Sequence, residues 1–222
     1  MGTLFSKALA AAVALALLTA ASEPAPKIHG RIPAGAGKPP VNWEARSSVI
    51  DYQTQHLHLR GDVRISQGEI SVESEDAEAT ATSKDSRSSH WVFSGKVHVR
   101  AEGQGELHAD HATVEILNGQ LASALVTGSP AQFQQTRSTT GRLVRGHATT
   151  IDYVVSSALV KLTGDAFLTD DQNENDMKAC QITYNVRDQQ IRGESDRCPD
   201  VKAHMTIMPR SNPGSAPAAG SP

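Results

Sequence analysis

The amino-acid sequence predicts an all-β protein built of antiparallel hairpins, and three observations support this prediction. Apolar and polar residues alternate along several segments, as they do in strands with one buried and one exposed face. A glycine recurs at the centre of such segments. The glycines at positions 61, 95, 128 and 164 are separated by 34, 33 and 36 residues, a spacing typical of stacked supersecondary units.

The clearest strand is 160–168, where apolar side chains occupy one parity and mostly polar ones the other. Segments 57–65 and 91–99 repeat this arrangement, and 125–131 is a weaker copy in which the parity breaks. A glycine inside a strand has no side chain to pack and marks a bulge, a bend or a close approach of two backbones.

A second motif lies between the glycine strands and reads Ala-Asp-His-Ala-Thr-Val at 109–114. Related copies occupy 146–153 and 178–184, and a degenerate one occupies 45–52. Each copy precedes a few polar residues and then a glycine strand, so each pair predicts a hairpin. Tetratricopeptide and ankyrin repeats share this period, but their helical periodicity is absent.

The predicted domain spans 42–208. We expect a polar loop at 134–141, and the acidic, Ser-rich segment 75–89 is predicted to be a strand end followed by a long exposed loop. The predicted strands are 41–52, 57–65, 70–74, 91–100, 106–117, 121–133, 143–153, 158–168, 177–186, 190–194 and 201–207.

The two ends of the chain have a different composition from the domain. Residues 1–22 have a positive start, an apolar run of eleven residues and small residues after it, which predicts a secretory signal peptide. The alternative is an uncleaved anchor, although the run is short for a membrane span. Segments 23–41 and 209–222 are rich in Pro, Gly and Ala, and we predict a disordered linker and a disordered tail.

Cys180 and Cys198 are the only cysteines, and an even count in an exported chain suggests a disulfide. If 182–186 and 190–194 form a hairpin that turns near 188–189, the two cysteines fall nearly opposite each other. The alternative is a pair of buried free thiols.

Composition and motifs give no support for catalysis or nucleic-acid binding. The chain has a net charge of −3 and no polybasic segment. His56 and His58 share one strand face with charged residues, which favours a solvated outer face over a metal site, and the same holds for His108 and Asp110. No nucleophile elbow, phosphate-binding loop or zinc-protease motif is present. We therefore predict no catalytic residue, no metal ligand and no cofactor.

The apolar faces of the strands are predicted to point inward, and two interpretations remain open. They either form an ordinary filled sandwich core, or line a space between two facing sheets that holds an apolar ligand. The residues concerned are Val63, Ile65, Trp91, Phe93, Val97, Val99, Val114, Ile116, Ile151, Tyr153, Leu162, Leu168, Ile182 and Tyr184.

The order of the two motifs resembles the OstA-like repeat of the periplasmic lipopolysaccharide-export bridge proteins. The likeness covers roughly 42–208 together with the signal peptide and tail. The residues that carry it are Val144-Arg145-Gly146-His147-Ala148, Ile151-Asp152-Tyr153, Val160 to Ala166 and Ile182-Thr183-Tyr184.

This resemblance implies an open, twisted β-jelly roll in the periplasm, with an apolar groove that binds lipopolysaccharide acyl chains and no cofactor. Family members stack end to end and join an inner-membrane export component to an outer-membrane translocon. Edge-strand pairing fits such contacts, with 42–52 and 201–207 as the expected edges. Arg64, Arg100 and Lys161 are candidates for contact with anionic head groups.

Two rival functions stay open at this point. The chain could be a membrane-tethered docking module of the same repeat superfamily, or an exported structural β-protein with a filled core.

Overall fold

The computed structural model describes residues 26–32, 39–82, 87–103, 105–136, 143–170, 175–185, 187–188, 190–196, 198 and 202–206. The predicted signal peptide (1–22) and tail (209–222) lie outside these residues. Within the described part of the chain, the secondary structure is entirely β, and no helix is long and apolar enough to cross a membrane. The strands are β1 (Ile28–Ile32), β2 (Val41–Ala45), β3 (Ser47–Asp51), β4 (His56–Gln67), β5 (Ile70–Ala81), β6 (Ser89–Ala101), β7 (Gly105–Leu117), β8 (Gln120–Thr136), β9 (Leu143–Val154), β10 (Leu159–Asp170), β11 (Asn175–Asn185), β12 (Gln190–Glu194) and β13 (His204–Thr206).

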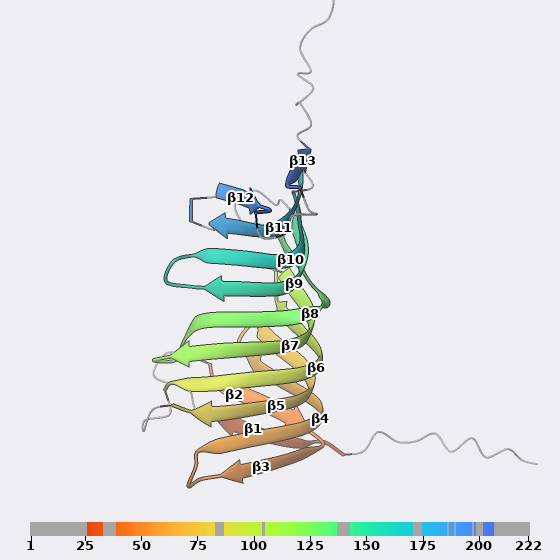
Figure 1. The fold of residues 1–222 in the computed structure, drawn as a ribbon. Helices are drawn as coiled ribbons and strands as arrows, with labels where there is room; N and C mark the ends of the chain where they lie inside the picture. The colour runs from red at the N-terminus through yellow and green to blue at the C-terminus, as the bar shows by residue number, and fades with distance from the viewer. Residues whose placement is uncertain are drawn as a thin grey trace, which may run out of the picture.

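The strands form one antiparallel sheet in which sequence neighbours are also spatial neighbours. The order runs β1-β2-β4-β5-β6-β7-β8-β9-β10-β11-β12, while β3 pairs with β4 and β13 pairs with β11. Figure 1 shows the long strands stacked from β3 at the bottom to β12 near the top, curving along the right of the view. The predicted fold class, an open antiparallel all-β structure of repeated hairpins, is confirmed.

The recurring glycines lie at the curve, and three of the four begin a left-handed bulge. Gly61, Gly95 and Gly164 have φ of 74°, 76° and 79°, and the residue after each also has a positive φ. The pairing register shifts by one residue at each of these points. Such a bulge bends a strand and increases its twist. Gly128 lacks this conformation and is followed by a cis Ser129–Pro130 bond, with a larger register shift.

The second motif is the partner of the bulge on the neighbouring strand. Inward residues there are three apart instead of two, as for Ala109 and Ala112 on β7 or Ala148 and Ile151 on β9, all of them buried. On β9, one of the two residues between the inward pair covers a bulge glycine. The side chain of Thr149 lies over Gly164 in this way.

These bends divide the sheet into two leaves. Leaf A contains β3, β12 and strand segments 56–60, 76–81, 89–94, 111–117, 120–127, 150–154, 159–163 and 181–185. Leaf B contains β1, β2, β13 and segments 63–67, 70–74, 97–101, 105–109, 131–136, 143–148, 166–170 and 175–179. A single apolar cluster joins residues of both leaves.

Three predicted segments differ from the structure. The predicted single strand 41–52 is divided at Arg46 into β2 and β3, and β2 is paired on both sides, by β1 and β4, so among the described residues only the β3 part of this range is an edge. The range 23–41, predicted as a disordered linker, contains β1, which pairs along β2; Gly30 lies against the Trp43 indole, where a Cβ would clash. Segment 75–89, predicted as a strand end followed by a long exposed loop, is strand as far as Ala81, and Ala77 and Ala79 are buried. Alanine supplies little strand signal, so the acidic neighbours dominated the pattern.

The predicted disulfide is present between Cys180 and Cys198, whose Cα atoms are 5.8 Å apart. The predicted hairpin register was wrong by two residues, because Gln181 pairs with Glu194 and Asn185 with Gln190. Cys198 lies beyond β12, in a turn where its N–H donates to the Ser195 carbonyl (2.9 Å). This turn, rather than direct opposition in the ladder, brings the two sulfur atoms together.

Replacing Gly164 with Ala is expected to lower the free energy of unfolding by about 1–3 kcal/mol, because a left-handed residue with a Cβ is strained. The new Cβ would also lie 2.7 Å from Thr149 Oγ1. Gly103→Ala is the control, since Gly103 has φ +69° and no atom within 4 Å of an added Cβ. Urea unfolding of both variants measures their losses of unfolding free energy. Equal losses would show that the Thr149 side chain over Gly164 contributes nothing.

The double variant Cys180→Ser/Cys198→Ser is expected to lose about 3 kcal/mol of unfolding free energy, as a disulfide closing a loop of this length restricts the unfolded chain. The two cysteines are 18 residues apart. Urea denaturation of oxidised and reduced wild-type protein gives the comparison. An unchanged midpoint after reduction would rule out a stabilising role.

Candidate functional site

The inner faces of the two leaves meet in a packed core next to the bend. Leu59 and Val63 lie on either side of the Gly61 bulge, and their exposed fractions are 0% and 2%. Leu162, before the Gly164 bulge, and Ile182, on the neighbouring β11, are at 0%. Water is therefore excluded along the bend.

Burial decreases from the bend toward the free margins of the leaves. On β6, Phe93 and Val97 flank the bulge with exposed fractions of 4% and 1%, whereas Trp91 and Val99, one step further out, are only partly buried. The same gradient recurs along other strands. We call the following partly exposed apolar residues the mouth residues: Trp91, Val114 and Val160 on leaf A, and Val41, Val72, Val99, Leu107 and Phe133 on leaf B.

This gradient describes two leaves that touch at the bend and part toward their margins. An apolar side chain that points inward but keeps contact with solvent is available to an apolar ligand. We call the space between the inner faces at this depth the groove, and the mouth residues of leaf A and leaf B lie on its two walls.

Trp91 provides the largest apolar surface of the mouth on leaf A. Its ring stacks on Phe93 with centroids 5.8 Å apart and an interplanar angle of 9°. The indole N–H donates to Ser89 Oγ (3.1 Å), so the polar edge of the ring is satisfied. The ring can then offer a flat apolar face without an unpaired donor.

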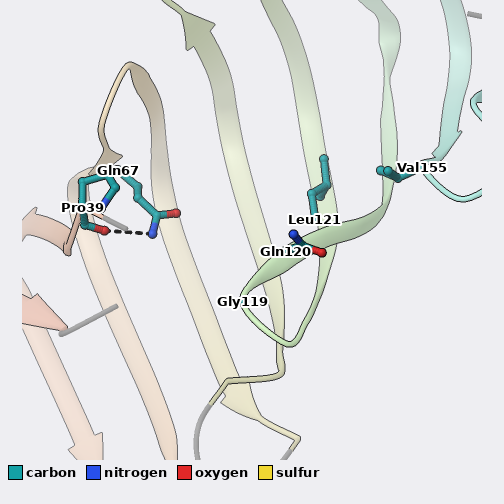
Figure 2. A pocket seen from close by; sticks show the side chains of 6 residues that line it. All are labelled: Pro39, Gln67, Gly119, Gln120, Leu121 and Val155. Atoms are coloured by element: carbon teal, nitrogen blue, oxygen red, sulfur yellow. Dashed lines mark hydrogen bonds between the residues drawn. The ribbon is translucent and has the colours of Figure 1, made fainter. Parts of the chain in front are cut away.

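A pocket of about 510 Å³ lies between the free margins of the two leaves (Figure 2). Pro39 and Gln67 line it from the leaf B side and are joined by a hydrogen bond from Gln67 Nε2 to the Pro39 carbonyl (3.1 Å). The hairpin turn at 119–121 and Val155 line it from leaf A. The margins are therefore hollow between them at this point.

Backbone hydrogen bonds near the margins join neighbouring turns of the same leaf. Within the described ranges, Gly119 N–H donates to the Arg87 carbonyl and Val155 N–H to the Ala122 carbonyl, both in leaf A. Glu102 N–H donates to the Glu69 carbonyl in leaf B. These bonds stiffen each margin separately.

The predicted lipid-binding residues all lie on the inner faces, but they fall into two groups. The prediction did not distinguish residues packed at the bend from residues that reach solvent. The buried group is Val63, Ile65, Phe93, Val97, Ile151, Leu162, Leu168, Ile182 and Tyr184. The partly exposed group is Trp91, Val99, Val114, Ile116 and Tyr153.

Leu107 and Phe133 were not predicted as mouth residues, because inward parity changes at the bends. On β7, Leu107 and Ala109 point inward before the bend, and Ala112 and Val114 after it. On β8 the inward set shifts from Val126 to Ala131 and Phe133 across two extra residues. A strict two-residue alternation places Leu107 and Phe133 on the wrong face.

The basic residues proposed for head-group contact point to the outer faces. Arg64 lies between the inward Val63 and Ile65 and forms an ion pair with Glu73 (3.5 Å). Arg100 follows Val99, and Lys161 precedes the buried Leu162, so both have outward parity. None of the three lines the groove.

The family model described as "LptA/(LptD N-terminal domain) LPS transport protein" matches residues 43–190, which are two thirds of the chain. The chain belongs to this family. The likeness predicted from the two alternating motifs is thus confirmed, and it covers the strands that build both leaves and most of the mouth.

Curated relatives and a solved structure agree with this assignment. The chain is 31% identical over 132 residues to the lipopolysaccharide export system protein LptA of Escherichia coli K12, covering 57% of this chain and 69% of that protein. The match to LptA of Shigella flexneri has the same values. LptH, described as the LptA-homologous periplasmic component of the lipopolysaccharide transport device of Pseudomonas aeruginosa, matches with a TM-score of 0.50 at 21% identity, covering 63% of this chain and 95% of that one. This last likeness supports the fold.

Proposed function

We propose that this chain is a periplasmic lipopolysaccharide carrier that binds acyl chains along the groove between its two leaves. The observation that supports this most strongly is the gradient of burial, which leaves apolar side chains of both walls in contact with solvent at the mouth. Membership in a family of lipopolysaccharide transport proteins supports the choice of ligand.

The groove suits transport because its walls are apolar and lack a strong directional site. Each CH₂ group of an acyl chain costs about 0.8 kcal/mol when exposed to water, so a chain that crosses an aqueous space needs a continuous apolar surface. The mouth residues are Val, Leu, Phe and Trp, which attract methylene groups without fixing one position. A lipid can therefore move along the walls without having to escape from a deep energy minimum at each step.

A periplasmic location is supported by three features. The first 22 residues have the pattern of a secretory signal peptide. The Cys180–Cys198 disulfide is the kind of bond that persists in an oxidising compartment. LptH, whose fold is similar, is described as a periplasmic component.

We further propose that copies of the chain stack end to end through their edge strands, and that the same edges pair with an inner-membrane export component and an outer-membrane translocon. At one end of the sheet, β3 exposes Val49 (62%) and Ile50 (46%). At the other end, β12 exposes Ile191 (39%) and β13 exposes Met205 (49%). Strand addition would pair the backbones of these edges and bury the exposed apolar side chains.

Trp91→Asp is expected to weaken lipopolysaccharide binding about ten- to hundredfold, because a buried aromatic contact of about 1.5–3 kcal/mol is lost. Isothermal titration calorimetry of purified protein with lipopolysaccharide measures the dissociation constant. Circular dichroism and a urea midpoint show whether the variant is folded.

Leu125→Asp is the matched control for Trp91→Asp. Leu125 is 45% exposed on β8, with parity opposite to the inward Val126, and faces outward. Binding by this variant should equal that of wild type. Equal binding by folded Trp91→Asp and wild-type protein would contradict the proposed groove.

The double variant Val49→Lys/Ile50→Lys is expected to weaken self-association at least tenfold, because charges on an edge strand oppose pairing with a second strand. Sedimentation velocity over a range of concentrations gives the association constant. Leu125→Lys adds charge to a strand whose two edges are already paired and serves as the control. If the edge variant associates as wild type does, the stacking model fails.

A further inference from the structure

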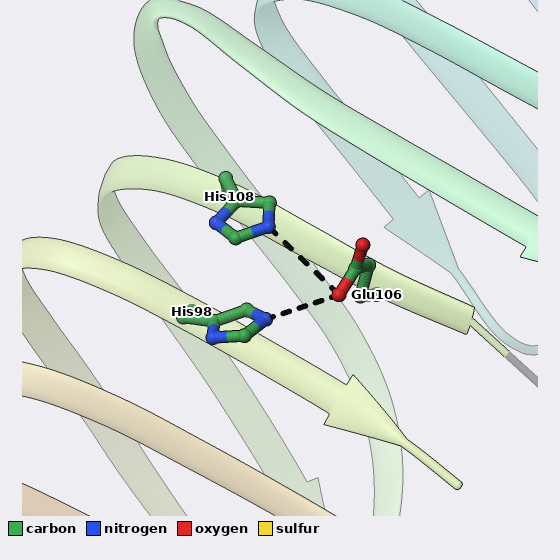
Figure 3. A group of neighbouring side chains, drawn as sticks. All are labelled: His98, Glu106 and His108. Carbon is green, nitrogen blue, oxygen red and sulfur yellow. Dashed lines mark hydrogen bonds and ion pairs between the residues drawn. The ribbon is translucent and has the colours of Figure 1, made fainter.

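Two histidines and a glutamate converge on the outer face of leaf B, away from the groove (Figure 3). His98 on β6 is directly opposite His108 on β7 in the pairing register, and Glu106 lies two residues before His108 on the same face. The two imidazole rings are stacked with centroids 4.1 Å apart and an interplanar angle of 14°.

The nitrogen and oxygen atoms of the three side chains are close to a metal-binding geometry. Glu106 Oε2 lies 3.4 Å from His98 Nε2 and 4.0 Å from His108 Nε2, and one donor atom from each residue lies within 4.8 Å of the other two. Donors around a tetrahedral zinc ion with bonds of 2.0–2.1 Å are separated by about 3.4 Å. The two stacked rings would have to rotate out of their parallel arrangement so that a nitrogen lone pair of each points at one ion.

A neighbouring side chain lies behind each of two of these donors. Glu73 Oε2 on β5 lies 3.9 Å from His98 Nδ1, the ring nitrogen that does not face Glu106. Gln134 Nε2 on β8 donates to Glu106 Oε1 (2.6 Å), which leaves Oε2 turned toward the histidines. A carboxylate behind a ligating histidine and a hydrogen bond to a ligating carboxylate are the usual supports of a metal site.

We propose that His98, His108 and Glu106 bind one divalent transition-metal ion of the zinc class. Two imidazoles and one carboxylate suit Zn²⁺, Cu²⁺ or Ni²⁺, whereas Mg²⁺ and Ca²⁺ prefer all-oxygen sites. The three ligands come from two adjacent strands of the ladder, so the ion would link β6 to β7 on the outer face. This site is independent of the proposed lipid groove.

A second cluster of His58, Asp76 and Glu78 has the same ligand types but a different environment. Arg60 Nε donates to His58 Nε2 (3.0 Å), the nitrogen that faces Asp76, and lies 3.7 Å from Asp76 Oδ2. A guanidinium already occupies the position of a cation there. This difference favours the His98 cluster as the metal site, and the His58 cluster supplies a control residue.

The test is a titration of untagged, metal-stripped full-length protein with Zn²⁺ in competition with a chromophoric chelator. One equivalent per chain is expected to bind. His108→Ala should weaken binding at least 100-fold by removing a ligand. Glu73→Gln should weaken it about 10- to 100-fold with the stoichiometry kept, as a change behind the ligand does.

His58→Ala is the matched control and should bind zinc as wild type does. His108 has a side-chain exposed fraction of 56%, so its removal leaves the core intact, and the urea midpoint of the metal-free variant verifies this. Two results would overturn the proposal. One is that wild-type protein binds zinc no more tightly than His98→Ala/His108→Ala does, and the other is that His58→Ala loses zinc binding. The experiment contains no lipopolysaccharide, so its outcome does not depend on the proposed function.

Discussion

The left-handed bulge at Gly61, Gly95 and Gly164 is the constraint on which the rest of the structure depends. It inserts one residue into each of β4, β6 and β10 and, together with the larger register shift near Gly128 on β8, bends the whole ladder along one line. At two of these bulges the residue after the glycine pairs with an opposite charge: Arg46, between β2 and β3, pairs with Asp62, and Glu75 on β5 pairs with Lys96 at 2.7 Å and raises the pKa of that lysine. The repeat period therefore sets the bend, and the bend creates two leaves with one shared inner face.

A sheet that bends instead of closing leaves two free margins, and this explains how a stable core and an open groove coexist. Leu59, Leu162 and Ile182 are fully buried near the bend and provide the packing that stabilises the fold. Further out, the leaves diverge, and Trp91 and Phe133 keep apolar surface in contact with solvent. Of the two interpretations of the apolar faces, the filled core thus describes the residues near the bend, and the proposed ligand space concerns only the partly exposed residues further out.

Much of the fold could be predicted because hairpin signals and glycines are local. The parts that failed have weak local signals or follow a change of parity. Ile28–Ile32 lies in a Pro-, Gly- and Ala-rich segment with little strand signal, and it forms β1 only because β2 offers an edge. Ala77 and Ala79 contribute burial without strand propensity. Leu107 and Phe133 line the mouth because the bend changes the parity of β7 and β8, which a period of two cannot reveal.

The central claim is that apolar chains enter between the leaves and touch inward residues only. Its most direct test places a photoreactive amino acid, one position at a time, at residues 113–116 of β7 and measures crosslinking to lipopolysaccharide. Val114 and Ile116 have inward parity, while Glu115 bonds His90 on the outer face and Thr113 shares its parity. The account predicts crosslinks at 114 and 116 and none at 113 and 115. Equal crosslinking at all four positions, or crosslinking confined to 113 and 115, would contradict it.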